Sequence, residues 1–337
     1  MASVLTILFT ILICFGAGGI EAQTGRIADD EMNALHEIAE QVGKKDWDFN
    51  QTNCDENGNW GKTTFVKPTY NNTVNCTCSS GVCHITAIFL KGQDLSGVLP
   101  RSLAKLPYLK TVDFTRNYLN GTIPPEWASI KLEYLSVTVN RLSGPIPNYL
   151  GNITSLIYMS LENNMFYGTV PAELGNLVNL KNLILSANNL IGELPKELNN
   201  LTNLTELRLS SNNFTGKLPS FQSWKQLQKL ELQASGFEGP IPPSISLLHN
   251  LTELQIMLKA IILNGRRISN LNGWDSQFPL LENMSEMSML MLCNCNISGL
   301  IPKYLTTMRK LKYLDLSFNR LEGTVPKFEG PNDLHFM

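Results

Sequence analysis

Charged residues are scarce in this chain of 337 residues, and neither sign dominates. Asp, Glu, Lys and Arg together make up 17% of the sequence, the formal net charge is -2 and the isoelectric point is near 6.1. Nucleic acids and anionic membranes attract proteins with a basic surface, so we expect neither as a partner. Hydrophobic residues reach 43%, which is enough to form a core and argues against wholesale disorder.

Histidine is also rare, and the known catalytic motifs are missing. The four histidines are His36, His84, His249 and His335, and no two of them have the spacing of metal ligands. No Cys-x2-Cys pair, Gly-x-Ser-x-Gly motif, phosphate-binding glycine loop or kinase catalytic loop occurs. We therefore expect no catalytic residue, no metal and no cofactor.

Long apolar runs are absent except at the N-terminus. The run from Val4 to Ile13 is followed by small residues and Ala22, a pattern typical of a secretory signal peptide over residues 1–22. The alternative is a signal anchor that stays in the membrane, although the run is short for a stable span. The next most apolar stretch, Met257–Leu263, is shorter and contains Lys259.

Asparagine is frequent in the sequence Asn-x-Ser/Thr, the acceptor for N-glycosylation. These sequons support passage through the secretory pathway, and we expect glycans on the mature protein. They occur at Asn50, Asn71, Asn75, Asn120, Asn152, Asn200, Asn203, Asn213, Asn250, Asn283 and Asn296.

A repeat of 23 to 24 residues organises residues 84–337. The unit reads L-x-x-L-x-L-x-x-N-x-L-x-G-x-I-P-x-x-L-x-x-L, as in Leu180 to Asn203. Leucines at positions 1, 4 and 6 are expected to point inward from a short strand, and the asparagine at position 9 to satisfy buried backbone groups of adjacent coils. Such coils bury apolar surface only by stacking. The predicted fold is an α/β solenoid, a right-handed leucine-rich-repeat superhelix of about ten coils with a concave parallel β-sheet.

Residues 23–83 lack the repeat and are predicted to form an N-terminal cap. Glu31 to Val42 has helical periodicity, and four cysteines follow in a pattern typical of secreted proteins. The cysteines are Cys54, Cys76, Cys78 and Cys83. Three pairings are possible, and we favour Cys54–Cys76 with Cys78–Cys83.

These patterns, with the cap sequence Trp47-Asp48-Phe49 and the segments LKGQDLSGVLP, RNYLNGTIPPEW and LQASGFEGPIP, resemble plant leucine-rich-repeat receptor-like kinases. The resemblance covers residues 31–337 and is closest to the subfamily with a malectin-like domain. It implies that a malectin-like domain, a membrane helix and a serine/threonine kinase follow in the family, whereas this chain ends in the repeats without a C-terminal cap. Its expected location is the apoplast, or the outer side of the plasma membrane for the full-length family.

The repeat breaks once, between Leu251 and Met287, where the interval is 36 residues. Joining Leu254 to Arg267 restores the phase, so residues 255–266 are interpreted as an insertion extruded as a loop. It is either a binding loop or an artefact of the gene model.

Because strand residues alternate between faces, positions 3, 5, 7 and 8 of each repeat should lie on the concave face. In the early coils these positions combine aromatic rings with short polar groups, which suit an oligosaccharide or an extended peptide, although an ordinary solvated face is the alternative. The candidate ligand-binding residues are Asp113, Arg116, Tyr134, Ser136, Thr138, Tyr158, Ser160 and Glu162.

The later coils carry opposite charges at neighbouring positions. We expect Glu206 to pair with Lys229 and Arg208 with Glu231, so that the charges on this surface neutralise one another. The predicted function is an extracellular receptor domain that binds a cell-wall sugar, a peptide or a co-receptor. The alternative is a secreted inhibitor of a pathogen's wall-degrading enzyme.

Overall fold

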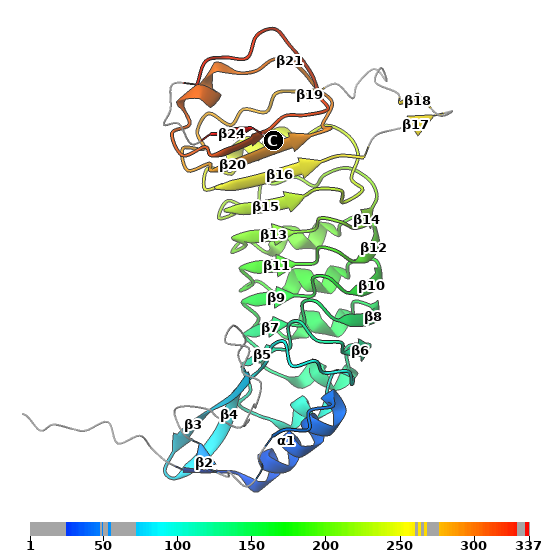
Figure 1. Ribbon diagram of the computed structural model, residues 1–337, viewed down its shortest axis with the longest axis vertical. Coiled ribbons are helices and arrows are strands. Elements are labelled where there is room, and N and C mark those ends of the chain that lie inside the picture. The colour runs from blue at the N-terminus through cyan, green and yellow to red at the C-terminus, as the bar shows by residue number, and fades with distance from the viewer. Residues whose placement is uncertain are drawn as a thin grey trace, which may run out of the picture.

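The computed structural model describes residues 25–47, 49, 53–54, 72–259, 262–263, 266–267, 276–328 and 334–336. The expected signal peptide and the sequons at Asn50 and Asn71 lie outside these residues. Figure 1 shows a stack of coils that rises from the cap at the N-terminal end.

The cap consists of one α-helix and short strands. Its elements are β1 (Gly25–Ile27), α1 (Asp29–Val42), β2 (Asn53–Cys54), β3 (Asn72–Ser79) and β4 (Val82–Leu90). The predicted helix is confirmed, and its apolar face, with Leu35 and Ile38, is fully buried. Helix α1 ends at Gly43, whose φ of 78° suits a residue without a side chain.

The cap docks onto the first coil through backbone contacts at the end of α1. The amides of Gly97 and Val98 donate to the carbonyls of Val42 and Gln41, at 3.2 and 2.8 Å. A Cβ atom at Gly97 would lie 2.0 Å from the Gln41 carbonyl oxygen, so this approach requires glycine. Two carbonyls at the C-terminal end of α1 are therefore satisfied by the stack that it covers.

One long sheet runs through the described residues and confirms the predicted solenoid. It has 14 strands, and β4 and its successors are parallel in the order of the chain. After β4 these strands are β5 (Thr111–Asp113), β7 (Tyr134–Ser136), β9 (Tyr158–Ser160), β11 (Asn182–Ile184), β13 (Glu206–Arg208), β15 (Lys229–Leu232), β16 (Glu253–Met257), β20 (Met289–Cys293), β22 (Tyr313–Asp315) and β24 (His335–Phe336).

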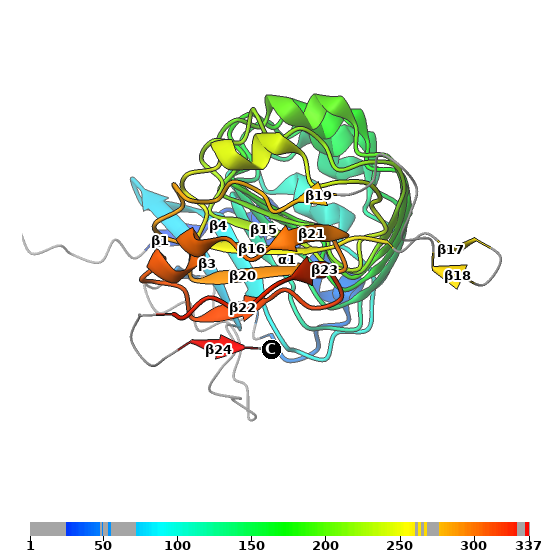
Figure 2. The same cartoon turned by 90° about the horizontal axis from the view of Figure 1, so that it is seen from above.

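Smaller sheets form a second side of each coil. One contains β6 (Asn120–Gly121), β8 (Arg141–Pro145), β10 (Met165–Gly168), β12 (Asn189–Gly192) and β14 (Asn213–Phe214), and another contains β19 (Ser276–Gln277), β21 (Ile297–Leu300) and β23 (Arg320–Glu322). Across the coil from the long sheet lie short 3-10 helices (Figure 2). These are η1 (Arg101–Lys105), η2 (Pro125–Ser129), η3 (Asn148–Asn152), η4 (Ala172–Asn176), η5 (Lys196–Asn200), η6 (Pro243–Leu247) and η7 (Lys303–Thr307).

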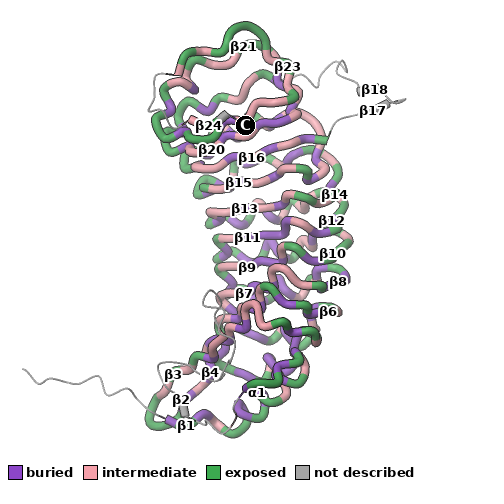
Figure 3. The backbone as a smooth tube through the Cα atoms, in the orientation of Figure 1, coloured by how far each residue is buried: buried purple, intermediate pink, exposed green. Residues whose placement is uncertain are grey.

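The core is a continuous interior column of repeat leucines and their substitutes (Figure 3). Beside it runs a ladder of asparagines at position 9. Asn188 is representative: its Nδ2 donates to the carbonyls of Leu161 and Leu185 at 3.0 and 3.1 Å, and its Oδ1 accepts from the Phe166 amide at 3.0 Å. The ladder confirms the predicted role of this residue.

The expected insertion over residues 255–266 is wrong at its first boundary. Gln255 to Met257 continue β16 and pair with Met291 to Cys293 of β20, and Ile256 and Leu258 are buried. These two apolar side chains fill core positions, so the strand retains them. The separate antiparallel pair of β17 (Ile262–Leu263) and β18 (Arg266–Arg267) lies outside the long sheet (Figure 1).

Candidate functional site

The parallel register brings the candidate residues of successive coils together on the concave face. Tyr134 on β7 lies between Thr111 of β5 and Tyr158 of β9, as the repeat predicts. In the next row, Asp113, Ser136 and Ser160 are lateral neighbours. Equivalent repeat positions therefore form rows on the concave face that run along the stack.

Tyr134 and Tyr158 form a stacked pair. Their ring centroids are 4.3 Å apart and the rings are inclined by only 8°, because neighbouring parallel strands hold equivalent side chains at this spacing. Burial raises the pKa of both phenols, and the nearby phenol of Tyr158 adds to the effect at Tyr134. Both hydroxyls thus remain protonated donors at physiological pH. One face of each ring is occupied by the other ring, so a ligand meets the ring edges, the hydroxyls and the two outer faces.

A chain of hydroxyl groups lies next to the tyrosines. Ser136 Oγ lies 2.7 Å from Thr115 Oγ1 and donates to Thr138 Oγ1 at 3.2 Å, and Thr138 Oγ1 lies 2.6 Å from Ser160 Oγ. Ser136 and Ser160 are only 2% and 1% exposed. The sequence correctly places these serines in the row, and their hydroxyls are already paired with neighbouring hydroxyls, so the two serines support their neighbours.

The remaining candidates surround this centre. Asp113 accepts a hydrogen bond from the Thr115 amide at 3.0 Å, and Arg116 is exposed at the end of the strand with a φ of 60°. Glu162 is half-buried, and its burial raises the pKa of its carboxyl, an effect that the Arg208 guanidinium opposes. Glu162 therefore belongs to the charged surface of the later coils.

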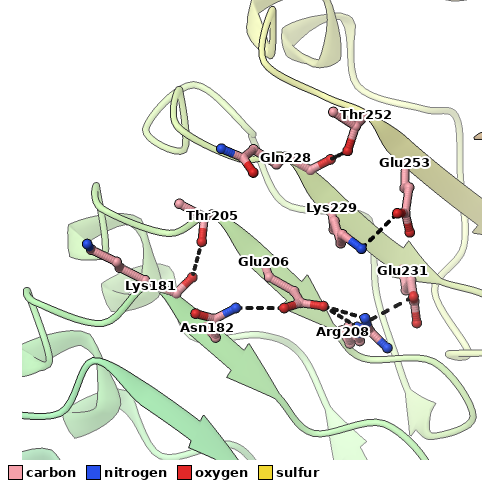
Figure 4. Close-up of polar contacts among 10 residues, drawn as sticks. All are labelled: Lys181, Asn182, Thr205, Glu206, Arg208, Gln228, Lys229, Glu231, Thr252 and Glu253. Atoms are coloured by element: carbon pink, nitrogen blue, oxygen red, sulfur yellow. Dashed lines mark hydrogen bonds and ion pairs between the residues drawn. The ribbon is translucent and has the colours of Figure 1, made fainter. Parts of the chain in front are cut away.

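That charged surface differs in part from the prediction (Figure 4). Arg208 pairs with Glu231 at 3.5 Å as expected, but it also contacts Glu206 at 2.5 Å within its own strand. Glu206 and Lys229 are in register, yet Lys229 forms its ion pair with Glu253 at 2.7 Å. Lys229 lies in register between Glu206 and Glu253, and Glu206 is already engaged by Arg208 and Asn182. The expected Glu206–Lys229 pair is thus replaced by the pair with Glu253.

Two concave-face residues were missed from the sequence. Asn182 lies beside Tyr158 in the row and donates through Nδ2 to Glu206 Oε2 at 2.6 Å, so it links the aromatic and charged surfaces. Ser186 is buried, and its Oγ has no hydrogen-bond partner in the described structure. Asn182 is at position 3 and Ser186 at position 7 of the repeat that starts at Leu180, and these positions alone could have identified both residues.

Four of the described sequons lie away from the concave face, whereas Asn75 lies on β3 of the long sheet, paired with Ala87. Asn120 and Asn213 lie on the second sheet, and Asn152 and Asn200 end 3-10 helices on the far side of the coil. Each of these four is exposed. Glycans at these positions would leave the concave face open.

The cysteines divide into bonded and free groups. The predicted Cys78–Cys83 disulfide is confirmed, with an S–S distance of 2.03 Å, and Cys76 is disulfide-bonded as well. The structure does not describe the Cys54 side chain, so the Cys54–Cys76 pairing stays a prediction. Cys293 and Cys295 are free and buried, and burial raises the pKa of the Cys293 thiol to about 11, which disfavours the reactive thiolate.

The described part of the chain has no candidate metal centre and no candidate membrane span. No group of three or more His, Cys, Asp or Glu side chains there could hold a metal ion. No described helix has the length and apolarity that a membrane span requires.

Known proteins match this chain along most of its length. The family described as "Leucine-rich repeat region" matches residues 82–265, and "Leucine Rich Repeat" matches residues 310–330. Two Arabidopsis thaliana proteins, each named "Probable LRR receptor-like serine/threonine-protein kinase", are 46% identical over 336 residues and 43% identical over 154 residues. These alignments cover 98% and 44% of this chain, but only 31% and 15% of the relatives, so the chain spans less than a third of their length.

Among solved structures, the Arabidopsis receptor kinase HAESA, in complex with the peptide hormone IDA and the co-receptor SERK1, superposes with a TM-score of 0.73. The sequence identity is 25%, and the match covers 89% of this chain and 47% of that structure.

Proposed function

The chain belongs to the leucine-rich-repeat family, and we propose that it is the ligand-recognising extracellular part of a plant receptor-like kinase, with the concave sheet as its binding surface. The observation that carries this proposal is the open row on β5, β7 and β9, where Tyr134 and Tyr158 stand over a connected set of hydroxyls. The kinase activity in the relatives' names is not assigned to the described residues, which form the cap and the coils.

An extended peptide is the ligand class that this geometry favours. A sugar ring binds aromatic side chains through their flat faces, and the stacking of the two tyrosines leaves only one outer face of each ring for such a contact. The ring edges, hydroxyls and half-buried Asn182 instead offer polar contacts in successive coils along the stack, which suit backbone groups of an extended chain. The HAESA structure holds a peptide hormone, which supports the same class.

The proposal places the chain outside the cell. The closely spaced cysteines, one disulfide of which is formed, suit an oxidising compartment, and the described sequons are accessible. In this interpretation the sequons carry glycans, the signal peptide directs secretion, and the co-receptor named in the HAESA complex indicates a second class of partner.

A library of capped heptapeptides tests this function. The glycosylated chain should bind a subset of the library, and Tyr134→Ala with Tyr158→Ala should weaken those interactions at least tenfold, since each ring contributes on the order of 1 kcal/mol when a ligand covers it. Tyr167→Ala is the matched control, because Tyr167 is 54% exposed but lies on β10 of the second sheet. Equal affinities of the wild type and the double variant would refute the proposed surface.

A further inference from the structure

A cluster of charged and polar residues lies beside the tyrosine row, on β13 and β15 and just beyond the ends of β9 and β11. We call Glu162, Ser186, Glu206, Arg208 and Glu231 the acidic sector. It contains three carboxylates and one guanidinium. The nearest other cation of the face, Lys229, is engaged with Glu253 at 2.7 Å. The sector therefore carries more negative charge than its own arginine neutralises.

The contacts within the sector leave specific oxygens available. Glu206 is engaged through both of its oxygens, since Oε1 contacts Arg208 and Oε2 accepts from Asn182. Glu231 has only the 3.5 Å contact with Arg208 Nε (Figure 4). The Glu162 carboxylate forms no hydrogen bond or ion pair with any described residue, although the charges of Arg208 and Glu206 both act on it. The free acceptors are thus those of Glu162 and Glu231.

Ser186 provides a second observation, a buried hydroxyl without a partner among the described residues. Its strand lies between those of Glu162 and Ser210, because the Asn163 amide donates to the Ser186 carbonyl at 3.0 Å and the Ala187 amide to the Ser210 carbonyl at 2.8 Å. The Ser186 side chain is 4% exposed, and its Oγ lacks a partner within the described residues. A buried hydroxyl without a partner costs about 1–3 kcal/mol, so such a group is usually retained for a ligand or a bound water.

We propose that the acidic sector binds a basic side chain, Lys or Arg, of the peptide ligand. Glu162 and Glu231 would accept hydrogen bonds from its ammonium or guanidinium group, and the Ser186 hydroxyl would accept a further one. The excess carboxylate charge calls for a cation, and the Ser186 hydroxyl, which can accept as well as donate, is compatible with one. This inference rests on the proposed peptide-binding function and adds the charge of the ligand.

The test compares two synthetic probes that differ only in charge. One is the capped heptapeptide Ala-Ser-Ala-Arg-Ala-Ser-Ala, and the other has citrulline in place of arginine. Titration calorimetry should show the arginine peptide binding roughly tenfold more tightly, since a hydrogen bond to a charged group is worth about 1.5 kcal/mol or more. Spermidine serves as a competitor, and displacement of the arginine peptide at equal concentration would show that a free polyamine, not a peptide, is the ligand.

Variants of the sector should act in opposite directions. Glu162→Gln with Glu231→Gln should remove the preference for arginine, while the matched control Glu173→Gln, an exposed change on η4, should retain it. Arg208→Gln frees the carboxylates that this residue now neutralises, so it should tighten the arginine peptide several-fold. This gain cannot be produced by misfolding, which keeps the test informative if the double variant is unstable.

The outcomes separate the inference from the function. If the wild type bound the arginine and citrulline peptides equally, and the double tyrosine variant bound neither, the role of the acidic sector would be overturned. The proposed peptide-binding function would remain intact. A preference for arginine that survives Glu162→Gln with Glu231→Gln would also overturn it. Failure of every peptide in the library to bind would contradict both.

Discussion

Coils between residues 109 and 216 and coils between residues 227 and 300 share one sheet but satisfy their buried backbone differently. In the first region every coil has asparagine at position 9, and Asn117, Asn140, Asn164, Asn188 and Asn212 each bridge two coils. In the second region that position holds Ser235, Lys259 and Cys295. The Ser235 hydroxyl reaches only its own coil, at the Leu232 carbonyl, 2.7 Å away.

The difference shows that strand register and the asparagine ladder are separable. The strands of the second region remain in phase, with β15, β16 and β20 paired over four and five residues. Leucine packing and the backbone hydrogen bonds of the sheet are sufficient to continue the stack, while the ladder adds side-chain cross-links between coils. We therefore expect the second region to depend more on its apolar residues.

The largest expected effect comes from deleting residues 255–266. This change removes Ile256 and Leu258 from the core along with the end of β16, so the melting temperature should fall by several degrees or more, because each buried aliphatic side chain contributes about 2–5 kcal/mol. Deleting only residues 262–267, which form the separate β17–β18 pair, should change the melting temperature little. Calorimetric scans of both proteins decide the matter, and unchanged stability after the longer deletion would show that β16 is dispensable.

A smaller difference should separate the two kinds of position 9. Asn188→Ala leaves the Phe166 amide and the carbonyls of Leu161 and Leu185 without this partner, so we expect a loss of roughly 3 kcal/mol in unfolding free energy. Ser235→Ala removes one hydrogen bond and should cost about 1 kcal/mol. Urea denaturation measures both, with the exposed Asn189→Ala as control. Equal losses at the two positions would remove the distinction between the regions.

The smallest effect concerns pH at the junction of the regions, where Arg208 on β13 meets Glu231 on β15. Burial raises the pKa of Glu162 and Glu231 above the ordinary value of 4.5. The Arg208 guanidinium opposes both shifts, whereas the Glu206 carboxylate adds to both. The Glu253 carboxylate raises the pKa of Glu231 further. A raised pKa means that the folded chain binds protons more readily than the unfolded chain. Stability should therefore rise slightly as the pH falls from neutral through the raised pKa values towards 4.5.

Glu162→Gln with Glu231→Gln should abolish that gain, and thermal melts across this pH range would reveal it. Binding of the arginine peptide should change with the opposite sign, since protonated carboxyl groups no longer attract a cation. A wild-type melting temperature that falls over the same range, in parallel with the double variant, would contradict the assignment.

Much of this architecture could be predicted from the repeat, because leucine and asparagine at fixed positions dictate both the packing and the register. Tyr134 and Tyr158 were placed side by side on that basis, and the structure stacks them. Side-chain reach could not be predicted in the same way. Lys229 lies between Glu206 and Glu253 and pairs with Glu253, and Ser136 and Ser160 are buried, because both outcomes depend on the contacts that neighbouring side chains make.

The predicted first boundary of the insertion was wrong for a related reason. Phase counting treats all positions of the repeat as equal, but Ile256 and Leu258 keep their place because they bury apolar surface. The first apolar residues after Leu254 were therefore better evidence for the strand than the later match at Arg267.

The parallel register also gives the concave face a fixed scale of length. Neighbouring strands lie about 4.8 Å apart, whereas an extended peptide advances about 3.4 Å per residue, so two strand intervals correspond to roughly three peptide residues. Tyr158 on β9 and Arg208 on β13 are separated by two such intervals, with β11 between them. A peptide lying along the stack would then contact the tyrosine row and the acidic sector with residues about three positions apart. The solenoid would in this way select ligands by the spacing of their side chains as well as by their chemistry.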